Sequence, residues 1–258
     1  MNGDVIRNGR NQSLTSLRQS FYQRIKMVRA MAYPSTLPML HELTVGSRQS
    51  ALAKAQVIEI QREINKHFSS LTFDCIFVKT TGDKDQATSL RTLDKTDFFT
   101  KEIDALLLSG GCRIAIHSAK DLPDPLPKGL ALIALTHGLD PDDVVVLKKG
   151  VSLSLLPPKP IIATSSVRRE EAVRQLIPNA TFIDLRGTIE QRLTRLHGGG
   201  IDGVVVAEAA LIRLGLTHLN RVKLPGPTAP LQGKLAIVTR EGDLEMQALF
   251  QSLDSRQG

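Results

Sequence analysis

The stretch RIAIHSAKDLPDPLPKG, residues 113–129, decides the fold class. Its first five residues are largely apolar and predict a buried strand. Three prolines between residues 121 and 129 exclude a regular element there. His117, Ser118, Lys120 and Asp121 therefore lie at and just after the end of a buried strand. Ligands in open α/β sheets bind at such carboxyl ends, so this edge is the first candidate for a site.

Short apolar strands alternate with amphipathic helices on both sides of this stretch. The predicted strands are 43–45, 71–79, 113–117, 131–135, 144–147, 161–163, 181–185, 203–207 and 235–239. The predicted helices are 51–68, 97–109, 164–177, 188–197, one that ends at Gly215, and 243–253. The polar segment 81–96 is predicted to be a mobile loop. Strands that alternate with helices indicate an α/β fold with mostly parallel sheets.

We expect two lobes joined by two crossings of the chain. The first lobe comprises residues 41–137 together with 235–258, because the last strand and helix return to it. The second lobe comprises residues 138–234. This organisation is a hinge, and it predicts a ligand-binding cleft between the lobes.

The composition excludes several classes of protein. The chain has 258 residues, of which 41% are hydrophobic and 23% charged, which is typical of a soluble globular protein. No apolar run is long enough to cross a membrane. The two cysteines cannot form a disulfide framework, so a reducing, cytoplasmic compartment is expected.

The positive charge is concentrated near the N-terminus. The net charge is +7, and residues 1–40 contain six basic residues but one acidic residue. This segment is predicted to be a disordered extension. It is either an organelle-targeting peptide or an additional stretch before the folded body, and we favour the second interpretation. The body has no Trp and no Tyr, so nucleic acid is not an expected partner.

Three strand-to-helix turns combine hydroxyl groups with arginine: GSRQS at 46–50, TSSVRR at 164–169 and RGT at 186–188. Free backbone N–H groups and a guanidinium at a helix N-terminus bind anions. One such turn alone is more often a capped helix with a solvated arginine. Three in one chain predict a polyanionic small ligand. Thr188 and Gln191 also form a T-x-x-Q capping box.

Other reactive residues have simpler explanations. His117 is expected to be a hydrogen-bonded structural histidine rather than a metal ligand, and no cluster has zinc-ligand spacing. Cys75 and Cys112 lie in predicted strands and are expected to be core residues. Lys120 beside Asp121 is either a surface ion pair or an anion site with a proton-transfer carboxylate.

Together these segments resemble the porphobilinogen deaminase (hydroxymethylbilane synthase) family over residues 43–240. The matching stretches, in the order of the family, are VGSRQSALAKAQ (45–56), TTGDK (80–84), FTKEIDALL (99–107), IAIHSAKDLP (114–123), ATSSVRR (163–169), LRGTIEQRLTRL (185–196), DGVVVAEAALIRLGL (202–216) and LQGKLAIVTR (231–240). The motifs HS-x-KD-x-P and TSS-x-RR, in this order, are specific to the family.

The resemblance implies a fold like the type II periplasmic binding proteins, and a function. The family condenses four porphobilinogens into linear hydroxymethylbilane in tetrapyrrole biosynthesis and releases ammonia. Asp121 matches the catalytic carboxylate, which would hold pyrrole N–H groups and assist proton transfer. The positions that match residues binding cofactor and substrate carboxylates are Arg48, Ser50, Lys120, Ser165, Arg168, Arg169, Arg186, Arg192 and Arg213. The implied cofactor is dipyrromethane, the implied partner is porphobilinogen, and the protein is expected to be a monomer that binds neither membranes nor a metal.

The sequence also departs from the family pattern. A third, C-terminal domain, whose cysteine carries the dipyrromethane, is not found before Gly258. The stretch Gly110-Gly111-Cys112 mimics the attachment motif but lies in the first lobe, so no attachment cysteine is assigned. Three hypotheses follow: an active deaminase, an inactive or truncated pyrrole-binding homologue, and a solute-binding or regulatory domain of the same fold. We favour the first, because Asp121 and the arginines are retained.

Overall fold

A computed structural model describes residues 41–85, 88–89, 91 and 97–257. Residues 41–258 form one compact unit. The predicted N-terminal extension and much of the predicted mobile loop lie outside the described residues. The described part has no helix that is long and apolar enough to cross a membrane.

The first sheet has five strands in the order β2-β1-β3-β10-β4. Their bounds are β1 Glu42–Arg48, β2 Thr72–Val78, β3 Ile114–Ser118, β4 Leu130–Leu135 and β10 Leu235–Arg240. β1 pairs in parallel with β2 and β3, whereas β10 runs antiparallel to both β3 and β4. The strand that is last in sequence therefore lies inside this sheet, between two early strands.

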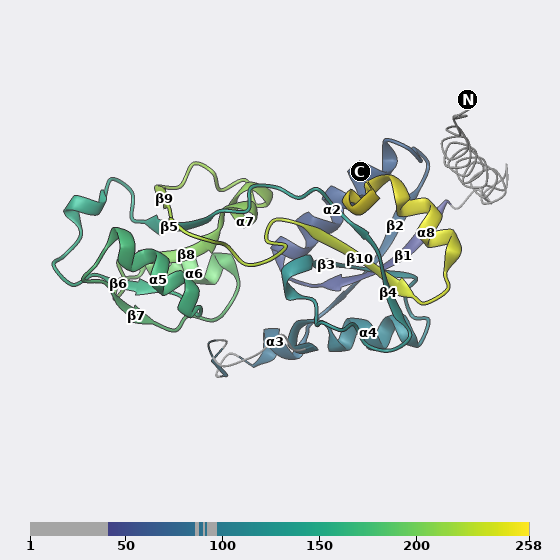
Figure 1. Cartoon of the computed structure of the whole chain (residues 1–258), viewed down its shortest axis with the longest axis horizontal. Helices are drawn as coiled ribbons and strands as arrows, with labels where there is room; N and C mark the ends of the chain where they lie inside the picture. Colours follow the sequence, from purple (N-terminus) through teal and green to yellow (C-terminus); the bar gives the residue numbers. More distant parts are fainter. Residues whose placement is uncertain (1–40, 86–87, 90, 92–96, 258) are drawn as a thin grey trace, which may run out of the picture. The chain divides into compact units, whose positions relative to one another are not determined.

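Helices cover the first sheet on both faces (Figure 1). α4 (Lys101–Leu108) packs Ile103 and Leu107 against one face, in a core that includes Ala115 of β3 and Val238 of β10. α2 (Ala51–Asn65) and α8 (Leu244–Phe250) lie on the other face. Each places apolar side chains at helical spacing toward the sheet, which is what stabilises the layers.

The second sheet has five strands in the order β7-β6-β8-β5-β9. Their bounds are β5 Asp143–Leu147, β6 Ile161–Ala163, β7 Thr181–Ile183, β8 Gly203–Ala207 and β9 Arg221–Lys223. β5 and β8 are buried along their whole lengths, because both faces of this sheet are covered. α5 (Val167–Leu176) packs on one face, while α6 (Ile189–His197) and α7 (Glu208–Arg213) pack on the other.

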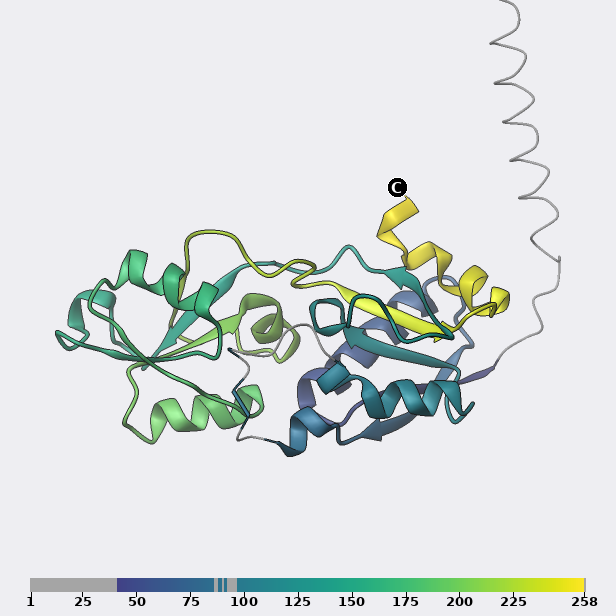
Figure 2. The same cartoon turned by 60° about the horizontal axis from the view of Figure 1, so that its bottom comes forward.

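Two connections join the sheets, one from β4 to β5 and the other from β9 to β10, and Figure 2 shows them side by side. We call these connections the first and second crossings, and we use first lobe and second lobe for each sheet with its helices. Lobe boundaries at 137/138 and 234/235 remain our proposal.

Several sequence predictions need correction. The sheets are not mostly parallel, since in each sheet two of the four strand pairings are antiparallel. The reason is that a strand adjoining a crossing, β10 in one sheet and β5 in the other, enters between parallel strands from the opposite direction. A short helix, α3 (Thr81–Lys84), begins the segment predicted to be a loop, and β9 was not predicted.

Candidate functional site

A cavity of about 880 Å³ lies between the two lobes. The first lobe lines it with the ends of β1 and β3 and the start of α2, and the second lobe with the start of α5 and of α6. The predicted site residues that line it are Arg48, Ser50, Lys120, Asp121, Ser165, Arg168, Arg169, Arg186 and Arg192. The structure thus brings together residues that lie up to 144 positions apart in the sequence.

The cavity is strongly cationic. Among the described residues that line it, eight are lysine or arginine and three are aspartate or glutamate. A concave surface with an excess of one charge concentrates ligands of the opposite charge. The site is therefore suited to a small polyanion.

Asp121 lies at the end of the 3-10 turn Ala119–Asp121 that directly follows β3. Its side chain is half-buried and lines the cavity. No hydrogen-bond donor of the described residues contacts its carboxylate. This carboxylate is therefore available to accept hydrogen bonds from a ligand N–H group.

Arg48 ends β1 and is held by Asp83 of α3. Its NH2 and Nε groups both donate to the Asp83 carboxylate, and its guanidinium lies 4.5 Å from the ring centre of Phe99. Burial alone would raise the pKa of Asp83, but the hydrogen bonds from Arg48 and Thr80 outweigh it and lower the pKa. Arg48 is thus fixed in direction before any ligand binds.

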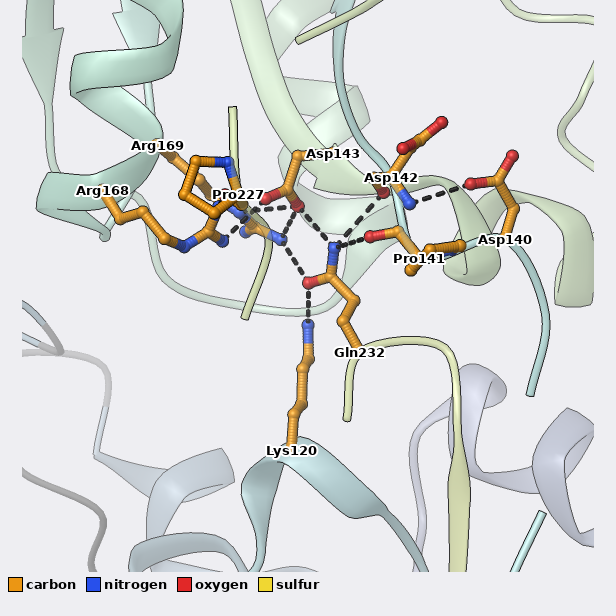
Figure 3. A network of polar contacts seen from close by, with 9 residues as sticks. All are labelled: Lys120, Asp140, Pro141, Asp142, Asp143, Arg168, Arg169, Pro227 and Gln232. Atoms are coloured by element: carbon orange, nitrogen blue, oxygen red, sulfur yellow. Dashed lines mark hydrogen bonds and ion pairs between the residues drawn. The ribbon is translucent and has the colours of Figure 1, made fainter. Parts of the chain in front are cut away.

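Arg168 and Arg169, in the first turn of α5, share one carboxylate, that of Asp143 at the start of β5 (Figure 3). Arg168 NH2 lies 2.7 Å from Asp143 Oδ2, and Arg169 NH2 lies 2.6 Å from Asp143 Oδ1. Burial opposes ionisation of Asp143, yet the two arginines lower its pKa. Asp143 neutralises part of the charge of the pair and fixes both side chains.

Lys120 extends from the first lobe toward this group. Its Nζ donates to Gln232 Oε1 at 3.2 Å. The pKa of Lys120 is lowered to about 8, mainly because the side chain is buried and secondly because the charge of Arg169 is close. Its ammonium is therefore poorly solvated, which favours an anionic ligand beside it.

Arg186 and Arg192, which flank the N-terminus of α6, form no ion pair within the described residues. Arg186 NH2 donates to the carbonyls of Gly82 and Asp85 of the first lobe, but its Nε and NH1 atoms are buried without a hydrogen-bond partner. Arg192 Nε donates to the carbonyl of Gly187. Burial lowers the pKa of both groups, that of Arg192 to about 10. Buried donors without partners are costly, so Arg186 is the strongest candidate for binding an anion. Arg192 is a further candidate, because it lines the cavity and forms no ion pair among the described residues.

The two serines have structural contacts as well. Ser50 is the N-cap of α2, where its hydroxyl accepts a hydrogen bond from the backbone N–H of Ala53. The Ser165 hydroxyl donates to Asp184 and to the carbonyl of Leu185. At the start of α6, the predicted capping box of Thr188 and Gln191 is confirmed.

Arg213 is the predicted site residue that does not line the cavity. It lies at the end of α7, is almost fully buried, and forms an ion pair with Glu59 of α2 in the first lobe. It lines a much smaller pocket of about 30 Å³ beside Lys120. In this structure its guanidinium group donates to protein acceptors, the Glu59 carboxylate and the Gly233 carbonyl.

His117 and Cys112 have the environments of core residues, but two expectations are wrong. Cys75 is not a core residue, because β2 is an edge strand of its sheet, and His117 lacks a predicted hydrogen bond. His117 is buried, and its Nε2 atom has no hydrogen-bond partner, so the predicted hydrogen bond is missing there. Burial lowers its pKa to about 4, so it is neutral at pH 7. Cys112 lies in the core of the first lobe, whereas Cys75 is half-buried on β2. No group of metal-ligating side chains is found in the described part.

Sequence reasoning missed four residues of the site. Asp83, Asp143 and Gln232 organise the cations, and Glu59 holds Arg213. Asp83 lies within the TTGDK stretch and could have been found there. The others carry no local signal, because each meets its partner through the fold.

The fold resembles that of the methionine binding protein MetQ. The crystal structure of MetQ aligns with a TM-score of 0.51 and 13% identity, over 83% of this chain and 90% of that chain. At this identity the likeness concerns the fold alone. The class defined by fold and site is thus a two-lobed binding-protein fold with a cationic cavity between the lobes.

Sequence comparison defines the family. The model described as "Porphobilinogen deaminase, dipyromethane cofactor binding domain" matches residues 43–248. The probable porphobilinogen deaminase of Chlamydia pneumoniae is 40% identical over 208 residues, which cover 81% of this chain and 88% of that protein. The porphobilinogen deaminase of Caldicellulosiruptor saccharolyticus is 38% identical over 77% of this chain and 68% of its own length. The chain belongs to the porphobilinogen deaminase family.

The side chains of the cavity could hold a dipyrromethane through hydrogen bonds and ion pairs. Arg186 offers buried guanidinium N–H groups without partners, which suit a carboxylate. The Asp121 carboxylate suits pyrrole N–H groups. Neither cysteine of the chain lines the cavity, so the described residues provide no thiol there for a covalent bond.

Proposed function

We propose that this protein is a porphobilinogen deaminase, a transferase that joins four porphobilinogens head to tail into linear hydroxymethylbilane. In each condensation the bond from the aminomethyl carbon to nitrogen breaks and ammonia leaves. The same carbon then bonds to the free α-carbon of another pyrrole, which loses a proton. When the chain of four pyrroles is released, water adds to its terminal methylene carbon and supplies the hydroxyl group of hydroxymethylbilane. The observation that supports this proposal best is the Asp121 carboxylate, which accepts no hydrogen bond from the described residues and lies in a cavity that eight cationic side chains of these residues line.

Asp121 is proposed to accept hydrogen bonds from pyrrole N–H groups. Its negative charge would stabilise the positive charge that develops on the pyrrole as ammonia departs. It would also take part in moving the proton that leaves the α-carbon. A bound dipyrromethane would supply the first acceptor pyrrole, and the arginines would hold its carboxylates.

The side-chain carboxylates of each pyrrole are proposed to contact the cationic groups. Arg186 and Arg192 form no ion pair with the acidic residues that the structure describes, whereas Arg48, Arg168 and Arg169 are already oriented by Asp83 and Asp143. Ser50 and Ser165 would add hydrogen bonds from the helix starts, and Lys120 would add them from the 3-10 turn that follows β3. Arg213 would contribute only if a ligand carboxylate displaced Glu59.

We also propose that the enzyme acts as a cytoplasmic monomer with porphobilinogen as its partner. Porphobilinogen is a small anionic molecule, and the charge and volume of the cavity suit it. Size-exclusion chromatography with light scattering tests the monomer directly.

The decisive experiment follows porphobilinogen consumption by the purified protein, together with uroporphyrin formed after acid treatment and oxidation. Consumption with uroporphyrin formation supports the proposal. A folded protein that binds porphobilinogen but does not consume it would contradict the proposal.

A further inference from the structure

Gln232 lies on the second crossing and is almost fully buried. The oxygen and the nitrogen of its side-chain amide both form hydrogen bonds (Figure 3). Its Oε1 accepts from Lys120 Nζ at 3.2 Å and from Arg169 NH2 at 3.5 Å. Its Nε2 donates to the Pro141 carbonyl at 2.6 Å and to Asp143 Oδ1 at 3.0 Å. Lys120 and Arg169 can only donate hydrogen bonds, so the amide oxygen of Gln232, and not its nitrogen, must face them.

The backbone beside Gln232 is unusual. Leu231, at φ 60°, is the sole non-glycine residue with a positive φ in the described part of the chain. Gly233 has a φ of 84°, and a Cβ atom there would lie 2.5 Å from the carbonyl oxygen of Leu139 on the first crossing. A leucine in this region is strained, and such strain is retained where the surrounding structure requires one particular geometry. Here that geometry brings the two crossings together and directs Gln232 between them.

Gln232 is the acceptor that orients Lys120. Lys120 faces Asp121, Asp143, Arg169 and Arg192, and among the described residues its ammonium donates one hydrogen bond, the bond to Gln232. An ammonium has three N–H donors, so two stay available for a ligand. A flexible lysine side chain held by one end in this way loses less freedom when a carboxylate binds.

We propose that Gln232 is a positioning residue that holds the Lys120 ammonium toward a ligand carboxylate in the cavity and fixes this ammonium relative to Asp143 and Arg169. This inference rests on the proposed function, because it assigns a carboxylate of the pyrrole substrate to Lys120. It also makes the second crossing part of the binding site, since one amide connects the first lobe, the first crossing and the arginine pair.

The first test compares Gln232→Met with Gln61→Met. Gln61 is a matched control, because its amide also joins two segments, donating to the Leu71 carbonyl and accepting from the Phe73 N–H, but it lies outside the cavity. Gln232→Met is expected to raise KM for porphobilinogen about tenfold while kcat changes less than about twofold, since it weakens an interaction made equally before and during the reaction. Gln61→Met is expected to leave both constants unchanged.

A double-mutant cycle separates positioning from a general effect on the fold. If Gln232 acts through Lys120, adding Gln232→Met to Lys120→Met produces little further increase in KM. Fully additive effects on KM would overturn the proposal.

The second test does not depend on turnover, so it distinguishes this proposal from the proposed function. Acetylation of Lys120 by acetic anhydride is measured by peptide mass spectrometry across pH. Gln232→Met removes an acceptor for the Lys120 ammonium, so the midpoint of the curve of acetylation against pH is expected to move to lower pH. Gln232→Glu places an anion beside the ammonium, so that midpoint is expected to move to higher pH. Opposite shifts cannot arise from destabilisation alone. Identical profiles in all variants would overturn the proposal, even if the protein consumes porphobilinogen.

Discussion

Arg213 and Glu59 join the two lobes through a bidentate ion pair. Arg213 Nε lies 2.7 Å from Glu59 Oε2, and Arg213 NH2 lies 2.9 Å from Glu59 Oε1. The same NH2 group also donates to the carbonyl of Gly233 on the second crossing. One buried guanidinium therefore connects α7, α2 and a crossing.

Glu59→Gln is expected to destabilise the protein by about 1–3 kcal/mol, because Arg213 loses a charged acceptor while it stays buried. Urea unfolding measures the loss. Arg62→Gln, on the same helix and without an ion pair among the described residues, is the control and should change stability by less than about 0.5 kcal/mol. An unchanged unfolding midpoint in Glu59→Gln would show that the ion pair does not stabilise the fold.

Asp121→Asn is expected to lower kcat by about 10²–10⁴-fold, because the amide can neither take up a proton nor supply a negative charge. The fold and porphobilinogen binding should persist, which calorimetry and thermal unfolding can verify. Asp124→Asn, three residues further on and exposed, is the matched control. Turnover at the parental rate in Asp121→Asn would refute the role assigned to this carboxylate.

Arg186→Met is expected to weaken porphobilinogen binding about tenfold to a hundredfold, since a carboxylate would lose a charge-assisted hydrogen bond. Binding is measured by calorimetry in the Asp121→Asn background, where turnover is expected to be slow enough not to interfere. Urea unfolding measures the stability of the variant separately, because the substitution removes two buried nitrogens without partners but also the hydrogen bonds from Arg186 NH2 to the carbonyls of Gly82 and Asp85. Arg174→Met on α5, whose side chain is about half exposed outside the cavity, should bind as before.

Lys120 predicts a pH dependence of stability. Its pKa is lowered from 10.5 to about 8 by burial, so between these pH values the unfolded chain binds a proton that the folded protein has released. The free energy of unfolding therefore rises with pH in that window. The destabilisation that comes from burying the charged Lys120 ammonium is complete below about pH 8. Lys120→Met should unfold at higher urea concentration than the parent at pH 7, and the difference should shrink by pH 10. A difference independent of pH would contradict this assignment.

Cys112 is expected to resist alkylation by iodoacetamide at pH 8 in the folded protein and to react after denaturation. It is almost fully buried, and burial raises its pKa to about 11, so little reactive thiolate forms. Peptide mass spectrometry distinguishes it from the half-buried Cys75. A pyrrole adduct mapped to Cys112 would contradict its interpretation as a core residue.

Much of the fold follows from local sequence patterns. The strands β6 and β8 have the predicted bounds, because continuous apolar runs between turn residues specify a strand covered on both faces. Strand direction could not be predicted from such patterns. β10 is antiparallel to β3 because of where the chain returns from the second lobe, and no property of residues 235–240 records this.

The site was predictable where residues follow a strand end or start a helix. Asp121, Lys120, Arg168 and Arg169 all have such positions, and the cavity includes them. The partners that orient them were not predictable. Gln232 lies 112 residues from Lys120, and Glu59 lies 154 residues from Arg213, so only the folded chain brings them within hydrogen-bond distance.

The position of β10 between β3 and β4 affects how the polypeptide can acquire its structure on the ribosome. β3 and β4 do not pair with each other, so the first sheet stays split until Leu235–Arg240 has emerged. The strands of the second sheet are contiguous in sequence and can assemble earlier. Because domains tend to fold as their sequence emerges, the second lobe would be completed before the first lobe, which contains both the earliest strands and the last one. During that interval β3 and β4 expose unpaired edges, which is where a nascent chain is most prone to aggregate or to require a chaperone.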